Sequence, residues 1–190
     1  MASIVGICNS ALIKLGASTI TSLTEGSKNA NLCAEQYDKT RQALLRQHPW
    51  NFAIARAKLA QLAGIPEFEF DHAYQLPSDW LRTLAVSDDD GGLGAVEYRI
   101  EGRTILSSAD DLYLRYVKDA ADPNDMDASF REALAWLLAA DLAIAITQSS
   151  TMREQMLQGL QTMLVAGRSI DAIEDFPESE PEPGWVAGRG

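Results

Sequence analysis

The sequence has no long uninterrupted apolar run. Its most apolar region, Ala133 to Ile146, contains Asp141 and is shorter than the 18 or so apolar residues that a membrane-spanning helix needs. The first ten residues, MASIVGICNS, place no basic residue before the apolar ones, which is not the pattern of a secretory signal. We therefore expect a soluble protein that is made in the cytoplasm.

Cysteine and histidine are also scarce. Cys8 and Cys33 each fall among the apolar positions of an expected helix, where a free cysteine behaves as a small apolar residue. Because cytosolic thiols stay reduced, we expect two buried thiols rather than a disulfide. His48 and His72 lie in no known nucleophile motif, so the sequence gives no support for a catalytic triad. We predict no catalytic residue, no metal site and no cofactor.

Basic residues are few outside the first third of the chain. Residues 1–64 hold seven Lys or Arg and three Asp or Glu, whereas the rest of the chain holds nine and twenty-four, giving −11 overall. Affinity for DNA comes largely from neutralising its phosphates, so the overall charge has the wrong sign for general DNA binding. A DNA-binding module that uses the basic N-terminal helices stays open as an alternative function.

What the chain does contain is enough apolar material for a core, since 46% of its 190 residues are hydrophobic. Apolar residues at spacings of three and four predict a helix over Ser3 to Leu15, with Ser3 as its cap and Gly16 just past its end. A second helix is predicted from about Ser27 to Gln47, ended by Pro49. Its inner face is expected to hold Ala30, Cys33, Ala34, Tyr37, Arg41 and Leu44.

The middle third is predicted to be a small antiparallel sheet. Between Trp50 and Leu62 the residues alternate in character as in a half-buried strand, although the many alanines would also suit a helix. A glycine turn at Gly102 predicts a hairpin between VEYRI and TILSS. Further strands are expected at His72 to Leu76, Leu84 to Val86 and Leu112 to Val117. Pro77 to Leu81 is predicted to be a short helical turn and Ser87 to Gly94 a surface loop.

The last third is predicted to form two helices, from about Ala128 to Gln148 and from Ser150 or Thr151 to about Glu174. The first is apolar nearly all round, which implies burial on more than one side, with another subunit as the expected second partner. Asp141 lies inside it. We expect that carboxylate to pair with Arg131, Arg153 or an arginine of a neighbouring subunit, because an unpaired buried charge is costly.

These elements predict an α+β fold, in which a helical bundle carries an inserted antiparallel sheet. The predicted parts are residues 1–48 and 121–176 for the bundle, 49–120 for the sheet, and 177–190 for a flexible acidic tail. The tail, PESEPEPGWVAGRG, combines prolines with mutually repelling glutamates and cannot form a packed core. Trp185 and Val186 near its end are candidates for a docking peptide.

Several residues have two interpretations. Trp50 and Phe52 could stack nucleic-acid bases, but we favour a packing role at a hinge, together with Pro49 and Trp80. The acidic residues of the middle third could serve a glycosidase or a calcium site, yet solvent-facing or pore-facing loops fit them better, because the pattern of an EF-hand is missing. These residues are Glu97, Glu101, Asp110, Asp111 and Asp88 to Asp90.

Four segments share their order and spacing with a known family. They are NSALIKLG with SLTE behind it, YDKTRQALLRQHPWNFA, YQLPSDWLR, and YRIEGRTILSS followed by LYLRYVKDAADPNDMDASFREALAWLLAADLA. Together they resemble the tail tubular protein A family, the head-to-tail adaptors of tailed phages. The resemblance covers roughly Ser3 to Phe176, and the acidic tail beyond it matches no feature of the family.

The resemblance implies a virion protein that forms a ring of about twelve copies between portal and tail. Such a ring joins the portal protein to the tail tube or nozzle protein, continues the DNA channel, and helps to retain and pass the genome. Its expected partners are further copies of the chain, the portal, the tail protein and double-stranded DNA bound without sequence specificity, with no membrane involved. Asp88, Asp89, Asp90 and Glu101 are then candidates to line the channel, where carboxylates repel phosphates.

Overall fold

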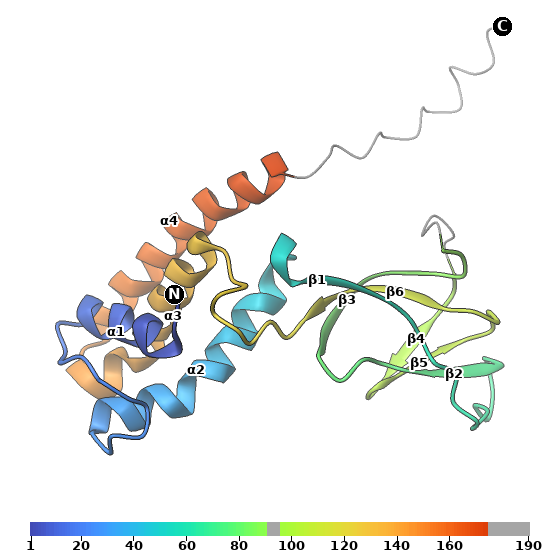
Figure 1. The fold of residues 1–190 in the computed structure, drawn as a ribbon, viewed down its shortest axis with the longest axis horizontal. Helices are drawn as coiled ribbons and strands as arrows, with labels where there is room; N and C mark the ends of the chain where they lie inside the picture. The colour runs from blue at the N-terminus through green and yellow to red at the C-terminus, as the bar shows by residue number, and fades with distance from the viewer. Residues whose placement is uncertain (91–95, 175–190) are drawn as a thin grey trace, which may run out of the picture.

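The computed structural model describes residues 1–90 and 96–174, with residues 166–174 described by their backbone only. Within these ranges, four α-helices and two three-stranded antiparallel sheets make an α+β fold. The helices gather at one end of the molecule and the strands at the other (Figure 1). The predicted fold class is confirmed, although the middle third forms two sheets rather than one.

The first two helices are α1 (Ile4–Lys14) and α2 (Lys28–Gln47), and local signals set their ends. The side chains of Ser3 and Ser27 accept hydrogen bonds from the first free N–H groups of their helices, as the sequence predicted. Gly16 follows α1 at a φ of +67°, a left-handed conformation that favours glycine. Of the predicted inner face of α2, Ala34 is the exception, because it is exposed.

The helix α3 (Ala128–Thr147) lies at the centre of the bundle and packs against α1, α2 and α4 (Ser150–Glu174). An apolar helix surface can therefore be buried on several sides by neighbours from the same chain. The second subunit that we expected for this purpose is not needed. The buried bundle core draws on all four helices and includes the two cysteines, which are free thiols.

The expectation of a buried ion pair at Asp141 is wrong. Asp141 is exposed, and its carboxylate accepts a hydrogen bond of 2.8 Å from the buried hydroxyl of Thr40 on α2. Arg131 donates instead to the backbone carbonyls of Pro123 and Met126. The apolar run around Asp141 suggested burial, but the phase of the helix places Asp141 on the solvent side, where Ile144 is exposed as well.

The strands form two sheets. The first sheet has the order β1-β6-β3 and the second the order β2-β5-β4, with antiparallel neighbours throughout. Their bounds are β1 Ile54–Lys58, β2 His72–Gln75, β3 Trp80–Ser87, β4 Arg99–Glu101, β5 Thr104–Ser107 and β6 Tyr113–Lys118. A 3-10 turn, Asn51–Ala53, precedes β1.

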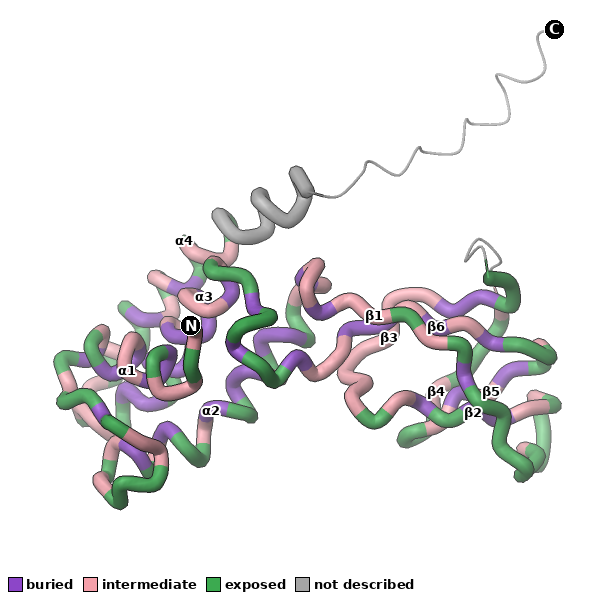
Figure 2. The backbone as a smooth tube through the Cα atoms, viewed as in Figure 1, coloured by how far each residue is buried: buried purple, intermediate pink, exposed green. Residues whose placement is uncertain are grey.

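The chain beyond β1 connects the two sheets. The N–H of Leu62 donates to the carbonyl of Ala73 at 2.7 Å, and the N–H of Gln75 donates to the carbonyl of Ala60 at 3.1 Å. The chain therefore pairs with β6 along β1 and then, through Ala60 and Leu62, hydrogen-bonds β2. A second core fills the space between the sheets, and its buried members are Leu59, Tyr74, Leu76, Val86, Ile105, Leu112, Leu114 and Tyr116. Figure 2 shows buried segments at both ends of the molecule.

The predicted helical turn at Pro77 to Leu81 is also wrong. Residues 78 and 79 form a turn in which the N–H of Trp80 donates to the carbonyl of Pro77 at 3.1 Å, and the chain is a strand from Trp80 onward. The strand β3 continues through the expected Leu84 to Val86 and pairs with β6. Ser78 and Asp79 resemble a helix cap, but this signal is local. Pairing with β6, in which Trp80 lies opposite Lys118, makes the segment from Trp80 a strand instead.

Candidate functional site at the junction of bundle and sheets

The chain crosses between the bundle and the sheets twice. It leaves α2 through residues 48–53 to enter β1, and it returns from β6 through residues 119–127 to enter α3. The two crossings start side by side, because Ile54 of β1 lies opposite Val117 of β6 in the sheet register. These segments and the residues that hold them are the candidate site.

Aromatic side chains anchor the first crossing. Trp50 is fully buried, and its ring centroid lies 5.2 Å from that of Phe130 on α3 in an edge-to-face arrangement. Phe52 meets the same ring at 5.0 Å, and His48 packs edge-on against Trp50 at 5.1 Å. Such pairs add about 0.5–1.5 kcal/mol each beyond their buried area. Pro49, between His48 and Trp50, ends α2 and directs the chain into this cluster.

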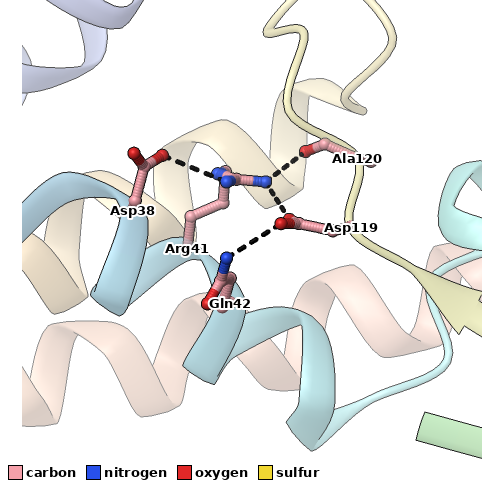
Figure 3. A network of polar contacts seen from close by, with 5 residues as sticks. All are labelled: Asp38, Arg41, Gln42, Asp119 and Ala120. Carbon is pink, nitrogen blue, oxygen red and sulfur yellow. Dashed lines mark hydrogen bonds and ion pairs between the residues drawn. The ribbon is translucent and has the colours of Figure 1, made fainter. Parts of the chain in front are cut away.

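The second crossing is held by Arg41 of α2 (Figure 3). Its Nη1 donates to Asp119 Oδ1 and, at 3.0 Å, to the carbonyl of Ala120, while Nη2 donates to Asp38 Oδ1 at 3.0 Å. Gln42 donates to the other oxygen of Asp119 at 2.8 Å. We call Asp38, Arg41, Gln42, Asp119 and Ala120 the Arg41 network.

The burial of Arg41 makes this network energetically important. Its side chain is only 3% exposed, whereas the side chains of Asp119 and Asp38 are 24% and 71% exposed. A buried guanidinium without partners would cost several kcal/mol, so its contacts to the carboxylate and the carbonyl are required for α2 to lie as it does. The network therefore fixes the segment after β6 to the middle of α2.

Further contacts hold β3 to the same region. Arg46 near the end of α2 donates to the carbonyl of Leu81, and Arg82 returns a hydrogen bond of 2.8 Å to the carbonyl of Arg46. The N–H of Asp119 donates to the carbonyl of Asp79 at 2.7 Å. Three arginines from α2 and β3 thus fasten both sides of the junction.

Tyr116 adds a polar contact inside the sheets. Its hydroxyl donates to the Asp79 carboxylate at 3.0 Å. Burial, and then the hydrogen bond and negative charge of Asp79, raise the pKa of Tyr116 to about 12. The phenol consequently stays protonated over the ordinary pH range and continues to donate.

The other predicted site residues lie away from the junction. Trp80 lies in β3 and packs on the core between the sheets, where its Nε1 donates to Thr83 Oγ1 at 3.1 Å. Asp88 to Asp90 are exposed directly after β3, and Glu101 is exposed as the last residue of β4, next to the turn that leads to β5. Trp185 and Val186, and the part of the Ser87 to Gly94 loop from residue 91 on, lie outside the described residues.

The remaining acidic and histidine candidates are spread over the sheet end. Asp111 forms an ion pair of 2.7 Å with Lys58, and Asp110 lies 3.4 Å from the Nε2 of His72. Gln61 hydrogen-bonds the other ring nitrogen of His72 at 2.8 Å. Within the described ranges, no group of three or more His, Cys, Asp or Glu residues is placed to hold a metal ion.

Sequence reasoning missed the Arg41 network. Arg41 was expected on the inner face of α2, and that was the available signal, because a buried arginine needs an anionic partner. Nothing in the sequence marked Asp119, which lies 78 residues further along the chain.

Exposed large apolar residues occur at both ends of the molecule. Leu62, Ile65 and Phe68 are exposed in the loop between β1 and β2, with Ile65 and Phe68 more than 70% exposed. Ile13 on α1 and Ile144 on α3 are exposed on the bundle. Scattered surface apolar residues are ordinary, but three within seven positions of one loop make a small apolar tip.

No protein-family model matches this chain, and no curated protein matches it. None of the described helices is long and apolar enough to span a lipid bilayer. The junction holds side chains that fix the bundle and the sheets relative to each other.

Proposed function

We propose that this protein is a structural adaptor of a virion, which forms a ring between the portal and the tail of a phage. In this role the helical bundle contacts the portal and the sheets contact the tail tube or nozzle. The DNA channel continues through the ring, with about twelve copies expected around it. The proposal begins from the resemblance of four sequence segments to the tail tubular protein A family.

The braced junction is the observation that carries the proposal. A protein that joins two large components has to hold its two contact regions in a fixed relation. Here Arg41, Arg46 and Arg82, together with the cluster around Trp50, tie α2 to both crossings and to β3.

The distribution of exposed apolar residues also supports an adaptor. A protein that joins a portal to a tail needs a separate contact surface for each of them. The apolar tip at Leu62, Ile65 and Phe68 and the separate exposed residues Ile13 and Ile144 lie at opposite ends of the molecule. The ends are thus available for different partners.

The alternative is DNA binding by the basic N-terminal helices. In the structure their cations already have protein partners, since Lys14 pairs with Glu132 at 2.7 Å and Lys39 pairs with Glu35 at 3.3 Å. Lys28 donates to the carbonyl of Ala145 at 2.7 Å, and Arg41 is buried. Phosphate binding needs cations that can reach the backbone of DNA. These contacts favour the adaptor over a helical DNA-binding surface.

Electron microscopy of the purified protein, alone and mixed with purified portal, tests the proposal. We expect ring-shaped particles that join the portal at one face, and no duplex DNA retained at 150 mM salt. The control is a portal preparation without the protein. The proposal is wrong if no complex with portal forms and the isolated protein instead binds duplex DNA with strong salt dependence.

A further inference from the structure

The two cysteines of the chain meet in the core of the helical bundle. Cys8 lies on α1 and Cys33 lies on α2, 25 residues further along the chain, and both are fully buried free thiols. They belong to the same cluster of buried side chains. The thiol of Cys8 donates a hydrogen bond to the sulfur of Cys33, so the two side chains are direct neighbours.

Hydrogen bonds around the loop between α1 and α2 hold the two helices in this relation. Asn9, which follows Cys8 in the sequence, exchanges two hydrogen bonds with the backbone of Ile20, at 2.9 Å and 2.8 Å. Asn29, in the first turn of α2, donates to the carbonyl of Ser18 at 2.9 Å. The loop is therefore fixed to both helices, which restrains how far the two thiols can move apart.

The two thiols differ in reactivity. The hydrogen bond with Cys33, and then burial, raise the pKa of Cys8. The same hydrogen bond lowers the pKa of Cys33, because it stabilises the Cys33 thiolate. The thiolate is the form of cysteine that acts as a nucleophile. Cys33 is therefore the nucleophile of the pair, and Cys8 is a protonated thiol held beside it.

Tyr37 adds a polar group next to this pair. It lies one turn after Cys33 on the same face of α2, and it is close enough to Cys8 for the two groups to interact electrostatically. The residue is only 3% exposed, and its hydroxyl has no hydrogen-bond partner among the residues that the structure describes. A buried hydroxyl without a partner is unfavourable. This group can therefore donate a hydrogen bond to an oxygen atom that enters the core.

We propose that Cys8 and Cys33 form a dithiol site, which a hydroperoxide converts into a disulfide between α1 and α2. The Cys33 thiolate attacks one oxygen of hydrogen peroxide, the O–O bond breaks, and the hydroxide that leaves takes up the proton that Cys33 released. The sulfur of Cys8 then attacks the sulfenic acid on Cys33, and the S–O bond breaks. The second hydroxide takes the proton of the Cys8 thiol. Two thiols are thus oxidised by two electrons, and one peroxide is reduced to two water molecules.

The disulfide would add a covalent bond between two helices that are otherwise held by packing and by the loop contacts. In a reducing compartment the thiols stay as they are in the structure, so the bond would record exposure of the protein to an oxidant. The proposal concerns the helical bundle alone and does not depend on a role in a virion.

Peptide mapping by mass spectrometry tests the disulfide in the full chain, which is first reduced and then treated with an excess of hydrogen peroxide. After treatment the protein is denatured, and the remaining free thiols are alkylated. We expect the peptides that contain Cys8 and Cys33 to be joined, without covalent dimers, and dithiothreitol to separate them again. Two alkylated thiols, links only between copies of the chain, or sulfinic acids without a link would overturn the proposal.

Single serine variants test which thiol reacts first, with dimedone as the probe for sulfenic acid. Cys8→Ser keeps a hydroxyl that can donate to Cys33, so Cys33 should be oxidised and trapped. In Cys33→Ser, the remaining Cys8 should be trapped at least about tenfold more slowly, because less of it is thiolate. Circular dichroism confirms that both variants are folded. Equal trapping rates would overturn the assignment of Cys33 as the nucleophile.

The variant Tyr37→Phe tests the hydroxyl beside the thiols, because it keeps the aromatic ring. Disulfide formation should become about fivefold slower, which corresponds to the loss of one hydrogen bond. Tyr98→Phe, at a position 39% exposed, is the matched control and should react at the rate of the wild type. An unchanged rate in Tyr37→Phe would exclude Tyr37 from the dithiol site.

Discussion

At the scale of single residues, Gly159 shows how closely the helices approach. A Cβ atom at this position of α4 would lie 2.4 Å from the ring of Trp136 on α3, so only glycine fits without movement. The ammonium group of Lys14 on α1 lies over the Trp136 ring, 4.5 Å from its centroid. The indole therefore meets both α1 and α4, and it links three helices of the bundle.

We predict that Gly159→Ala destabilises the protein by up to about 2 kcal/mol. The clash with Trp136 costs about 1–3 kcal/mol as overpacking, and the gain of about 1 kcal/mol that alanine brings to a helix interior offsets part of it. Urea denaturation followed by circular dichroism measures the change. Gln158→Ala, at an exposed position of the same helix, should alter stability by less than 0.5 kcal/mol, in the range of ordinary surface substitutions. A Gly159→Ala protein more stable than the wild type would show that Trp136 can move aside freely.

At the scale of elements, the Arg41 network determines how α2 and the segment after β6 are joined. We predict that Arg41→Met, which keeps an apolar side chain of similar length, lowers the free energy of unfolding by about 2–3 kcal/mol. In the wild type, the Asp119 carboxylate and the Ala120 carbonyl both accept charge-assisted hydrogen bonds from Arg41. The variant loses these bonds and leaves both acceptors without the guanidinium, which lowers the stability.

Denaturation in urea at neutral pH measures this change, with Lys39→Met on the same helix as the control. Lys39 forms an exposed ion pair with Glu35, of a kind that contributes about 0.3–0.5 kcal/mol. A loss at Arg41 no larger than the loss at Lys39 would mean that the network contributes nothing to the junction.

Elements with local signals could be predicted from the sequence, and those decided by distant partners could not. The ends of α1 and α2 follow from Ser3, Gly16, Ser27 and Pro49, which act within a few residues. Trp80 follows a sequence that suits a helical turn, yet β3 pairs with β6, and this pairing outweighs a local propensity. The same holds for the site. The aromatic residues Trp50 and Phe52 predict a packed cluster, whereas no feature of the sequence near Asp119 indicates that it binds Arg41.

At the scale of the whole molecule, two separate cores contain buried tyrosines. Tyr37 lies in the bundle core, and burial raises its pKa to about 12. Tyr116 lies in the core between the sheets, with its pKa also raised to about 12. In the unfolded chain a tyrosine ionises near pH 10, so each contributes stability that is present below pH 10 and is lost as the pH rises towards 12.

We therefore predict that the urea midpoint falls steeply between pH 10 and pH 12. A difference of two pKa units corresponds to roughly 2–3 kcal/mol for each group. Tyr37→Phe and Tyr116→Phe should each flatten this fall, whereas Tyr98→Phe, at a position 39% exposed, should leave it unchanged. An unchanged slope in both buried-site variants would mean that other groups govern alkaline unfolding.

The two crossings between bundle and sheets also have a mechanical consequence. A single peptide linker lets one part of a protein turn about it, whereas two chain segments fixed side by side resist rotation of one part against the other. The segments enter the sheets paired at Ile54 and Val117 and are fastened to α2 on both sides. A torque applied to the sheets is therefore transmitted to the bundle instead of being absorbed by twisting between them.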